Sequence, residues 1–193
     1  MTRRVAVLSI LTAVIGLCGA GARAEEHHAA LLALAKGVIR DIAAYEMVVE
    51  AVIAHNTRTA GYDAARIAAL DAQWQAEMMT GNLDLIDAVL TNDLSAFLSD
   101  TQRASNGLFT EIFVMDARGL NVGQSAATSD YWQGDEAKWR KTFLVGPGAV
   151  HLGPMRRDPS TGALQIHVST AIVDPATGRP IGAITFGVAA SRL

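Results

Sequence analysis

The hydrophobic pattern changes its period at Asn106-Gly107, and this change restricts the chain to folds that combine helices with a sheet. Residues 25–106 are rich in alanine and hold no proline, and their apolar side chains recur every three or four positions. Residues 107–193 instead alternate short apolar runs with turn sequences such as Asp174-Pro175-Ala176-Thr177-Gly178. A helical half followed by a meander of about five strands predicts an α+β fold.

Three helices are predicted in the first half. The first spans residues 26–56, the second contains residues 67–78 and ends near Gly81, and the third spans residues 83–101. The first helix carries an apolar stripe at alternating steps of four and three residues, formed by Leu31, Ala35, Val38, Ile42, Tyr45, Val49 and Val52. This heptad pattern suits packing on the chain's own sheet as well as homodimerisation through the N-terminal helix, and both interpretations stay open here.

Five strands are predicted in the second half, with one helical piece at residues 135–143. The strands cover residues 111–116, 120–125, 149–155, 162–173 and 181–189. Alternation along the fourth strand places Gln165, His167 and Ser169 on one face and an apolar set on the other, namely Leu164, Ile166, Val168 and Ile172. We expect the apolar face to pack on the first helix and the polar face to turn toward a cover formed by residues 128–145.

The first 24 residues have the features of a secretory signal peptide. Two arginines precede an apolar run over residues 5–17, and Ala22-Arg23-Ala24 supplies a small-x-small cleavage pattern. The predicted mature chain is therefore a single domain over residues 25–193, helical over 25–106 and containing the sheet and pocket over 107–193. We expect it to be periplasmic or secreted, because no later stretch is long and apolar enough to span a membrane.

Eight side chains are candidates for binding a small molecule. His151, His167, Ser169 and Thr185 fall on one face of the predicted sheet and would form a polar pocket floor. The segment Asp130-Tyr131-Trp132 would cover that floor, because aromatic rings beside a carboxylate can stack on a flat or cationic ligand. Lys138 would offer a point charge to a ligand carboxylate. The competing interpretation is that the histidines line an exposed face and the aromatic rings pack in the core.

The charge distribution and the sequence motifs argue against two classes of function, nucleic-acid binding and enzymatic catalysis. The formal charge of the chain is -3 and no basic stripe is present, which argues against a nucleic-acid partner. Residues 25–105 carry a net charge of about -7 and residues 106–193 about +1, so the strand half is the better host for an anionic ligand. Neither a Gly-x-Ser-x-Gly elbow nor a glycine-rich phosphate loop occurs, so we expect no enzymatic activity and no cofactor.

A metal site is an alternative interpretation of some of the same residues. Asp130, His151 and His167 could supply one oxygen and two nitrogen ligands, but no local spacing fixes them, and no metal ligand is assigned. A haem- or metal-binding periplasmic protein that uses His151 and His167 remains one alternative function. A ligand-free accessory protein of a membrane kinase or transporter is another.

Two segments resemble Cache domains, which are extracytoplasmic PAS-like sensors. Glu111-Ile-Phe-Val-Met-Asp-Ala-Arg-Gly119 resembles their strand that ends in Asp-x-x-Gly, and Ile181-Gly-Ala-Ile-Thr-Phe-Gly-Val188 resembles their glycine-rich last strand. Residues 128–139 lie where the family places its pocket-covering loops. The resemblance covers roughly residues 30–190 as architecture and 108–189 as sequence pattern.

The resemblance implies a sensor module with one pocket for a small organic anion or an amino-acid-like metabolite. In receptors of this family the last strand continues into a transmembrane helix, whereas this sequence stops at Leu193. We therefore expect a solitary module that relays its signal to a separate partner, such as a membrane sensor kinase, a chemoreceptor or a transporter.

Overall fold

The computed structural model describes residues 17–157 and 162–193, and most of the predicted signal peptide lies outside this part of the chain. The described residues form one antiparallel sheet in the order β2-β1-β5-β4-β3. The strands are β1 (Phe109–Asp116), β2 (Asn121–Gln124), β3 (Val150–Arg157), β4 (Leu164–Val173) and β5 (Pro180–Ala189). None of the described helices is both long and apolar enough to cross a bilayer.

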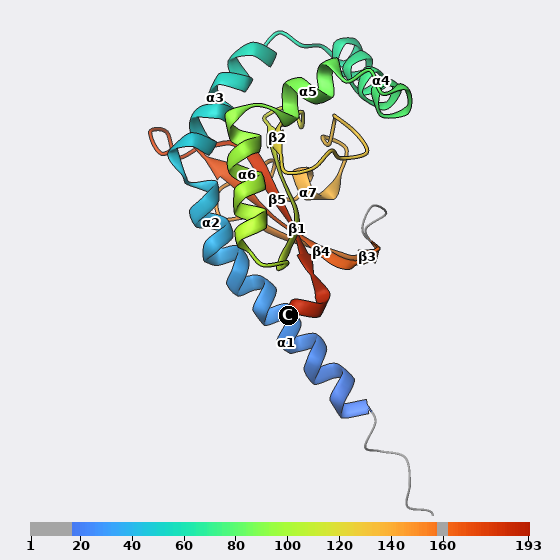
Figure 1. Ribbon diagram of the computed structural model, residues 1–193. Helices are drawn as coiled ribbons and strands as arrows, with labels where there is room; N and C mark the ends of the chain where they lie inside the picture. The colour runs from blue at the N-terminus through green and yellow to red at the C-terminus, as the bar shows by residue number, and fades with distance from the viewer. Residues whose placement is uncertain (1–16, 158–161) are drawn as a thin grey trace, which may run out of the picture.

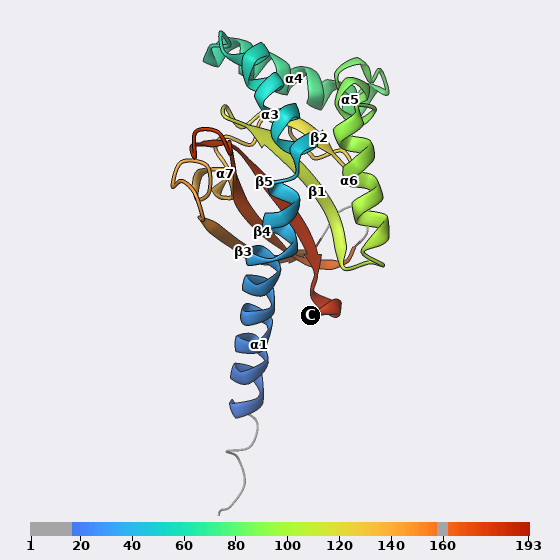
Figure 2. The ribbon, with the colours of Figure 1, turned by 90° about the vertical axis from the view of Figure 1, so that its left-hand side faces the viewer.

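Helices cover one face of the sheet, and a short helix with its loops covers the other (Figures 1 and 2). The helical layer consists of α1 (Leu17–Lys36), α2 (Val38–Ala43), α3 (Glu46–Thr59) and α6 (Asp93–Ala104). The opposite cover contains α7 (Ala137–Arg140), which packs against β3, β4 and β5. Two further helices, α4 (Ala64–Thr80) and α5 (Asp84–Leu90), lie at one end of the sheet (Figure 1).

The predicted division of β4 into an apolar and a polar face is confirmed. Ile166, Val168 and Ile172 belong to the main hydrophobic core between the sheet and the helical layer. Leu164 is the exception, because it begins the strand and is 45% exposed. Burial of this apolar face stabilises the packing of the sheet on the helical layer.

The helix predicted over residues 26–56 is divided into three helices, so the apolar stripe does not face the core along its whole length. Gly37 separates α1 from α2, and Tyr45 has an extended backbone at the start of α3. Val38 and Tyr45 are therefore exposed, by 41% and 53%, and Ile39 takes the fully buried position instead. Glycine has a low helix propensity, and the Tyr45 ring stacks on Phe97 of α6 with centroids 5.2 Å apart. These local and tertiary effects override the heptad pattern.

The helix predicted over residues 83–101 is also divided, into α5 and α6. Asn92 caps the start of α6, because its side chain accepts a hydrogen bond from the Ser95 amide at 2.9 Å. Its Nδ2 also donates to the Val122 carbonyl at 2.9 Å and ties this cap to β2. The predicted end of the second helix at Gly81 is confirmed, since Gly81 is a left-handed C-cap with φ of 76°.

The buried carboxylate of Glu77 links α4 to α5. It accepts hydrogen bonds from the backbone amides of Leu85 and Ile86 at 2.8 and 2.9 Å. Burial alone would raise the pKa of this carboxyl group, but these hydrogen bonds and one from Gln73 outweigh it, so the pKa lies below its ordinary value. Glu77 therefore supplies the N-terminal acceptor that α5 lacks in its own sequence.

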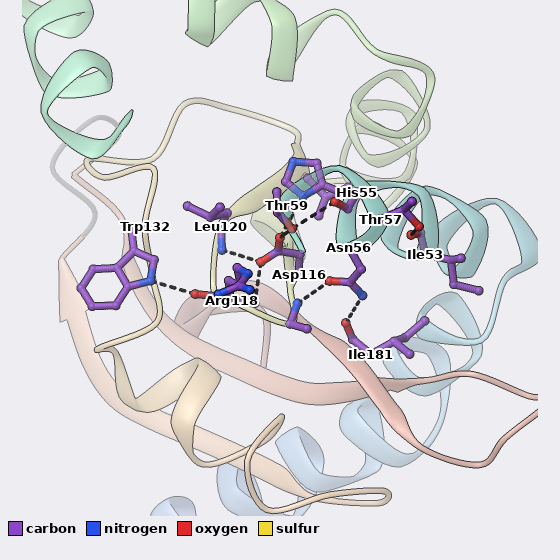
Figure 3. A network of polar contacts seen from close by, with 12 residues as sticks. Ile53, His55, Asn56, Thr57, Thr59, Asp116, Arg118, Leu120, Trp132 and Ile181 are labelled. Atoms are coloured by element: carbon purple, nitrogen blue, oxygen red, sulfur yellow. Dashed lines mark hydrogen bonds and ion pairs between the residues drawn. The ribbon is translucent and has the colours of Figure 1, made fainter. Parts of the chain in front are cut away.

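The Asp-x-x-Gly turn after β1 is built around the fully buried carboxylate of Asp116 (Figure 3). Its Oδ1 accepts from the amides of Arg118 and Leu120 at 2.8 and 2.9 Å. Its Oδ2 faces His55 Nδ1 at 3.0 Å and accepts from the Thr59 hydroxyl at 2.8 Å. The turn is thus fastened to α3, which lies more than fifty residues earlier in the chain.

Candidate functional site

His151, His167, Ser169 and Thr185 lie on the face of the sheet that α7 covers, and we call this surface the polar floor. His151, Ser169, Thr185 and Phe113 lie opposite one another across β3, β4, β5 and β1. Ser169 and Thr185 are fully buried, and their hydroxyl oxygens are 2.9 Å apart. Because α7 packs on three of these strands, the hydroxyl pair lies between the sheet and its cover.

His151 is at the edge of this floor and is only partly buried. Burial lowers its pKa from the ordinary value of 6.5, and the charges of Lys141 and His167 lower it further. Protonation of His151 is therefore disfavoured in the folded state.

His167 lies on the same face and is paired with a carboxylate that the sequence analysis did not single out. Its Nε2 is 2.9 Å from Glu111 Oε1, with side chains 26% and 20% exposed. Gln165 donates to the same Glu111 oxygen at 2.7 Å. The His167 ring meets the Phe113 ring edge to face, with centroids 6.0 Å apart. Glu111 was recognisable as a polar residue in the alternation of β1, but nothing in the sequence indicates that it meets His167.

Lys138 of α7 reaches over the floor from the cover. Its Nζ is 5.1 Å from the centroid of the Phe113 ring and donates to Gln133 Oε1 at 2.8 Å. Burial lowers the pKa of this ammonium group below its ordinary value, although nearby carboxylates oppose the shift. Within residues 17–157 and 162–193, no carboxylate lies within 4 Å of this nitrogen, so the cation is partly buried without an ion pair.

The structure places Tyr131 and Trp132 away from the polar floor. Tyr131 is 4% exposed and stacks on Trp74 of α4, with centroids 5.6 Å apart, in a second aromatic core under α4 and α5. Burial, as the largest cause, raises the pKa of its hydroxyl. Trp132 packs beside the same core and donates from Nε1 to the Arg118 carbonyl at 2.8 Å (Figure 3). Both rings fix the cover segment to the rest of the domain.

The segment 128–132 is attached mainly to α4. The Asp71 carboxylate accepts from the amides of Tyr131 and Trp132, both at 2.9 Å. Trp74 donates to the Thr128 carbonyl at 2.8 Å. The remaining candidate, Asp130, accepts from Gln75 of α4 at 3.2 Å. The cover therefore depends on α4 for its position.

The three-residue metal set of Asp130, His151 and His167 is not assembled. Asp130 is engaged by α4, whereas His167 is paired with Glu111. The described residues contain no group of three or more histidine, cysteine or acidic side chains suited to a metal ion.

Two buried amides on β2 were missed by the sequence analysis. Asn121 and Gln124 are fully buried, and both approach the Thr128 hydroxyl, at 2.8 and 3.1 Å. Gln133 is buried beside them and donates to the Asp130 carbonyl at 2.8 Å. No short sequence motif marks these residues, because a bulge in the β1–β2 pairing determines which way they point.

Two cavities lie elsewhere on the molecule. One, of about 380 Å³, lies where α6 meets β1 and is lined by Ser99, Gln102, Arg103, Gly107, Phe109 and Ser125. The other, of about 440 Å³, lies between α1 and the C-terminal residues and is lined by Ala30, Ala33, Leu34, Val38, Leu108, Arg192 and Leu193. Neither contains any of the eight predicted binding residues.

Comparisons with known proteins find no matching family model and no matching curated sequence. Similar solved structures are sensory domains. The ligand-binding domain of the Campylobacter jejuni chemoreceptor Tlp3, in complex with 4-methylisoleucine, is 12% identical, with a TM-score of 0.39, and the match covers 75% of this chain and 57% of that one. The sensor domain of the V. cholerae histidine kinase DctB is 11% identical, with a TM-score of 0.37 and coverages of 89% and 57%.

A third similar structure is the ligand-binding domain of the Pseudomonas fluorescens chemoreceptor CtaA in complex with L-alanine. It is 16% identical, with a TM-score of 0.38 and coverages of 65% and 51%. The chain thus spans just over half the length of these solved domains. Its own sheet order and helical layer confirm the α+β, PAS-like fold that the Cache resemblance implied.

Proposed function

We propose that this chain is an exported sensor module that binds a small organic anion or an amino-acid-like metabolite between the polar floor and its cover. The observation that carries the proposal is Lys138, whose ammonium group is partly buried over Phe113 and bonded to the neutral Gln133. A cation held in this way has lost part of its hydration without gaining a carboxylate partner. A ligand anion would supply that partner. Ser169, Thr185, His151 and His167 would offer further hydrogen bonds around it.

The proposed relay to a separate partner uses the helical layer. Asn56 of α3 accepts from the Ala117 amide at 2.8 Å and donates to the Ile181 carbonyl at 2.7 Å. Together with the Asp116 contacts, these bonds connect the ends of β1 and β5 to α3 (Figure 3). A ligand-dependent shift of the central strands would therefore be transmitted to α3 and the rest of the helical layer. A membrane kinase, chemoreceptor or transporter that binds this layer could respond to the shift.

Replacing Lys138 with methionine is expected to weaken ligand binding at least tenfold. A hydrogen bond to a charged group contributes about 1.5–3 kcal/mol, which corresponds to roughly a tenfold to a hundredfold change in Kd. The ligand is first identified by native mass spectrometry of whatever co-purifies, and binding is then measured by calorimetry and by thermal shift. Affinity should also fall at alkaline pH, before an ordinary lysine would lose its proton, because burial holds the Lys138 pKa low.

The matched control is Lys36→Met, since Lys36 is exposed at the end of α1, in the helical layer on the opposite face of the sheet from the cover. It should bind as the wild type does. Equal affinity in both lysine variants would contradict the proposal, and so would the absence of any bound or binding small molecule. An intense visible absorbance of the purified protein would instead favour the haem alternative.

We further propose that the chain forms a homodimer through its N-terminal helices. Val38 and Tyr45, the stripe members that do not pack on the sheet, are exposed, and Val38 lines the 440 Å³ groove. Light scattering should report a dimer for the wild type and a monomer for Val38→Glu. Met79→Glu, a change at an exposed apolar residue of α4, should leave the dimer intact. A monomeric wild type at high protein concentration would rule this interface out.

A further inference from the structure

Two buried polar atoms on β2 have no hydrogen-bond partner within the described part of the chain. They are Asn121 Oδ1, an acceptor, and Gln124 Nε2, a donor, and both residues are fully buried. Leaving such an atom unpaired in a protein interior costs free energy comparable with a lost hydrogen bond. A folded chain that keeps two such atoms on one short strand therefore calls for an explanation.

The two amides lie together on the face of the sheet that the cover encloses. In the β1–β2 pairing, Asn121 lies opposite Met115, and Gln124 lies opposite Phe113. Because Met115 and Phe113 are two residues apart on one strand, they share a face, and so do their partners. The shared Thr128 hydroxyl brings the two amide groups within hydrogen-bonding reach of one oxygen.

The two amides of Asn121 and Gln124 are connected to Lys138 through neighbouring residues and hydrogen bonds. Phe113, the neighbour of Gln124 across the strands, lies beneath the Lys138 ammonium. Lys138 bonds to Gln133, which donates to the Asp130 carbonyl, and the same carbonyl accepts from Asn121 Nδ2 at 3.1 Å. Because a carbonyl can only accept, this bond fixes the orientation of the Asn121 amide and leaves its Oδ1 free.

We propose that Asn121, Gln124 and Lys138 form the inner subsite for the ligand of the proposed function, on which this inference rests. Lys138 Nζ and Gln124 Nε2 would bind a carboxylate, and Asn121 Oδ1 would accept from a donor next to it. The ligand class is then a carboxylate with a neighbouring hydroxyl or ammonium group. A plain carboxylate would leave Asn121 Oδ1 unpaired.

Calorimetry with three probes of equal carbon number tests the proposed ligand class. The probes are propionate, L-lactate and L-alanine. Lactate, alanine or both should bind at least tenfold more tightly than propionate, and the better of the two identifies the donor as hydroxyl or ammonium. Equal affinity for all three would overturn the assignment of Asn121. If none binds while mass spectrometry finds another ligand, the proposed function survives and the inferred class is wrong; if no ligand is found at all, both fail.

Gln124→Met tests the subsite itself through two opposite effects. Removal of an unpaired donor should leave the melting temperature of the unliganded protein unchanged or higher, because the Thr128 hydroxyl can still donate to the Asp130 carbonyl at 2.8 Å. Binding of the preferred probe should weaken at least tenfold. Gln133→Met is the stability control, since both ends of that buried amide are bonded and its loss should lower the melting temperature. A Gln124→Met protein that melts earlier and binds normally would mean that the amides hold a structural water, and the inference would be wrong.

Discussion

Asp116→Ala is expected to lower the free energy of unfolding by about 3–5 kcal/mol, the range found when one partner is removed from a buried charged pair. The substitution removes the acceptor of His55 Nδ1, one of the two acceptors of the Thr59 hydroxyl, and the acceptor of the Arg118 and Leu120 amides in the turn. Since small domains are stable by only about 5–15 kcal/mol, this loss is a large share of the total. Urea denaturation followed by circular dichroism measures it.

The stability of the protein at acid pH should depend on the same Asp116 carboxylate. Burial would raise the Asp116 pKa, but the hydrogen bond and charge of His55, together with the other donors, hold it below the ordinary value of 3.8. A lowered folded-state pKa stabilises the protein above the unfolded-state pKa, and this stabilisation is lost as the pH falls from about 5 through the folded-state value. Asp116→Asn should therefore flatten the acid limb of the stability profile.

The control for Asp116 is Asp174→Ala. Asp174 also accepts a turn amide, that of Ala176 at 2.8 Å, but it lies at the surface. Its replacement should have a far smaller effect on unfolding. If Asp116→Ala unfolds at the same urea concentration as Asp174→Ala, the buried network does not stabilise the turn as described.

Gly119→Ala is expected to cost roughly 2–5 kcal/mol, in two parts. Gly119 has a φ of 81°, a left-handed conformation that costs other residues about 1–2 kcal/mol. An added Cβ would also overlap the backbone of Gly134, and such overpacking typically costs about 1–3 kcal/mol. Calorimetric melting of the variant measures the sum.

Gly178→Ala separates the two parts. Gly178 has a similar φ of 68°, but no atom of the described residues lies within 4 Å of its added Cβ, so only the conformational cost applies. Gly119→Ala should also loosen the cover, because the Gly119 carbonyl accepts from the Gln133 amide at 2.7 Å. Similar melting temperatures for the two glycine variants would show that the backbone near Gly134 moves easily enough to avoid the overlap with the added Cβ.

Local patterns predicted the sheet better than they predicted the helices. Alternation in β4 correctly separated Ile166 and Val168 from His167 and Ser169, since a strand presents each face every second residue. The heptad stripe left open which of its members pack on the sheet, and Val38 and Tyr45 do not, because the helix breaks at Gly37 and the Tyr45 ring stacks on Phe97. Tertiary contact decided the phase of these helices.

The site was only partly predictable for the same reason. Tyr131 lies in the core because Trp74, more than fifty residues away in sequence, stacks on it. Asn121 and Gln124 are three positions apart and would point to opposite faces in a regular strand. The irregular pairing with β1 turns both to one face, and no sequence rule indicates such a bulge.

Both outer edges of the sheet are unsuited to pairing with another chain. On one side, α5 and α6 pack against β2. On the other, β3 has Pro154, which carries no amide hydrogen, followed by the charged and exposed Arg156 and Arg157. Growth of the sheet from molecule to molecule is thereby discouraged at each end, which lowers the tendency to form fibrous aggregates.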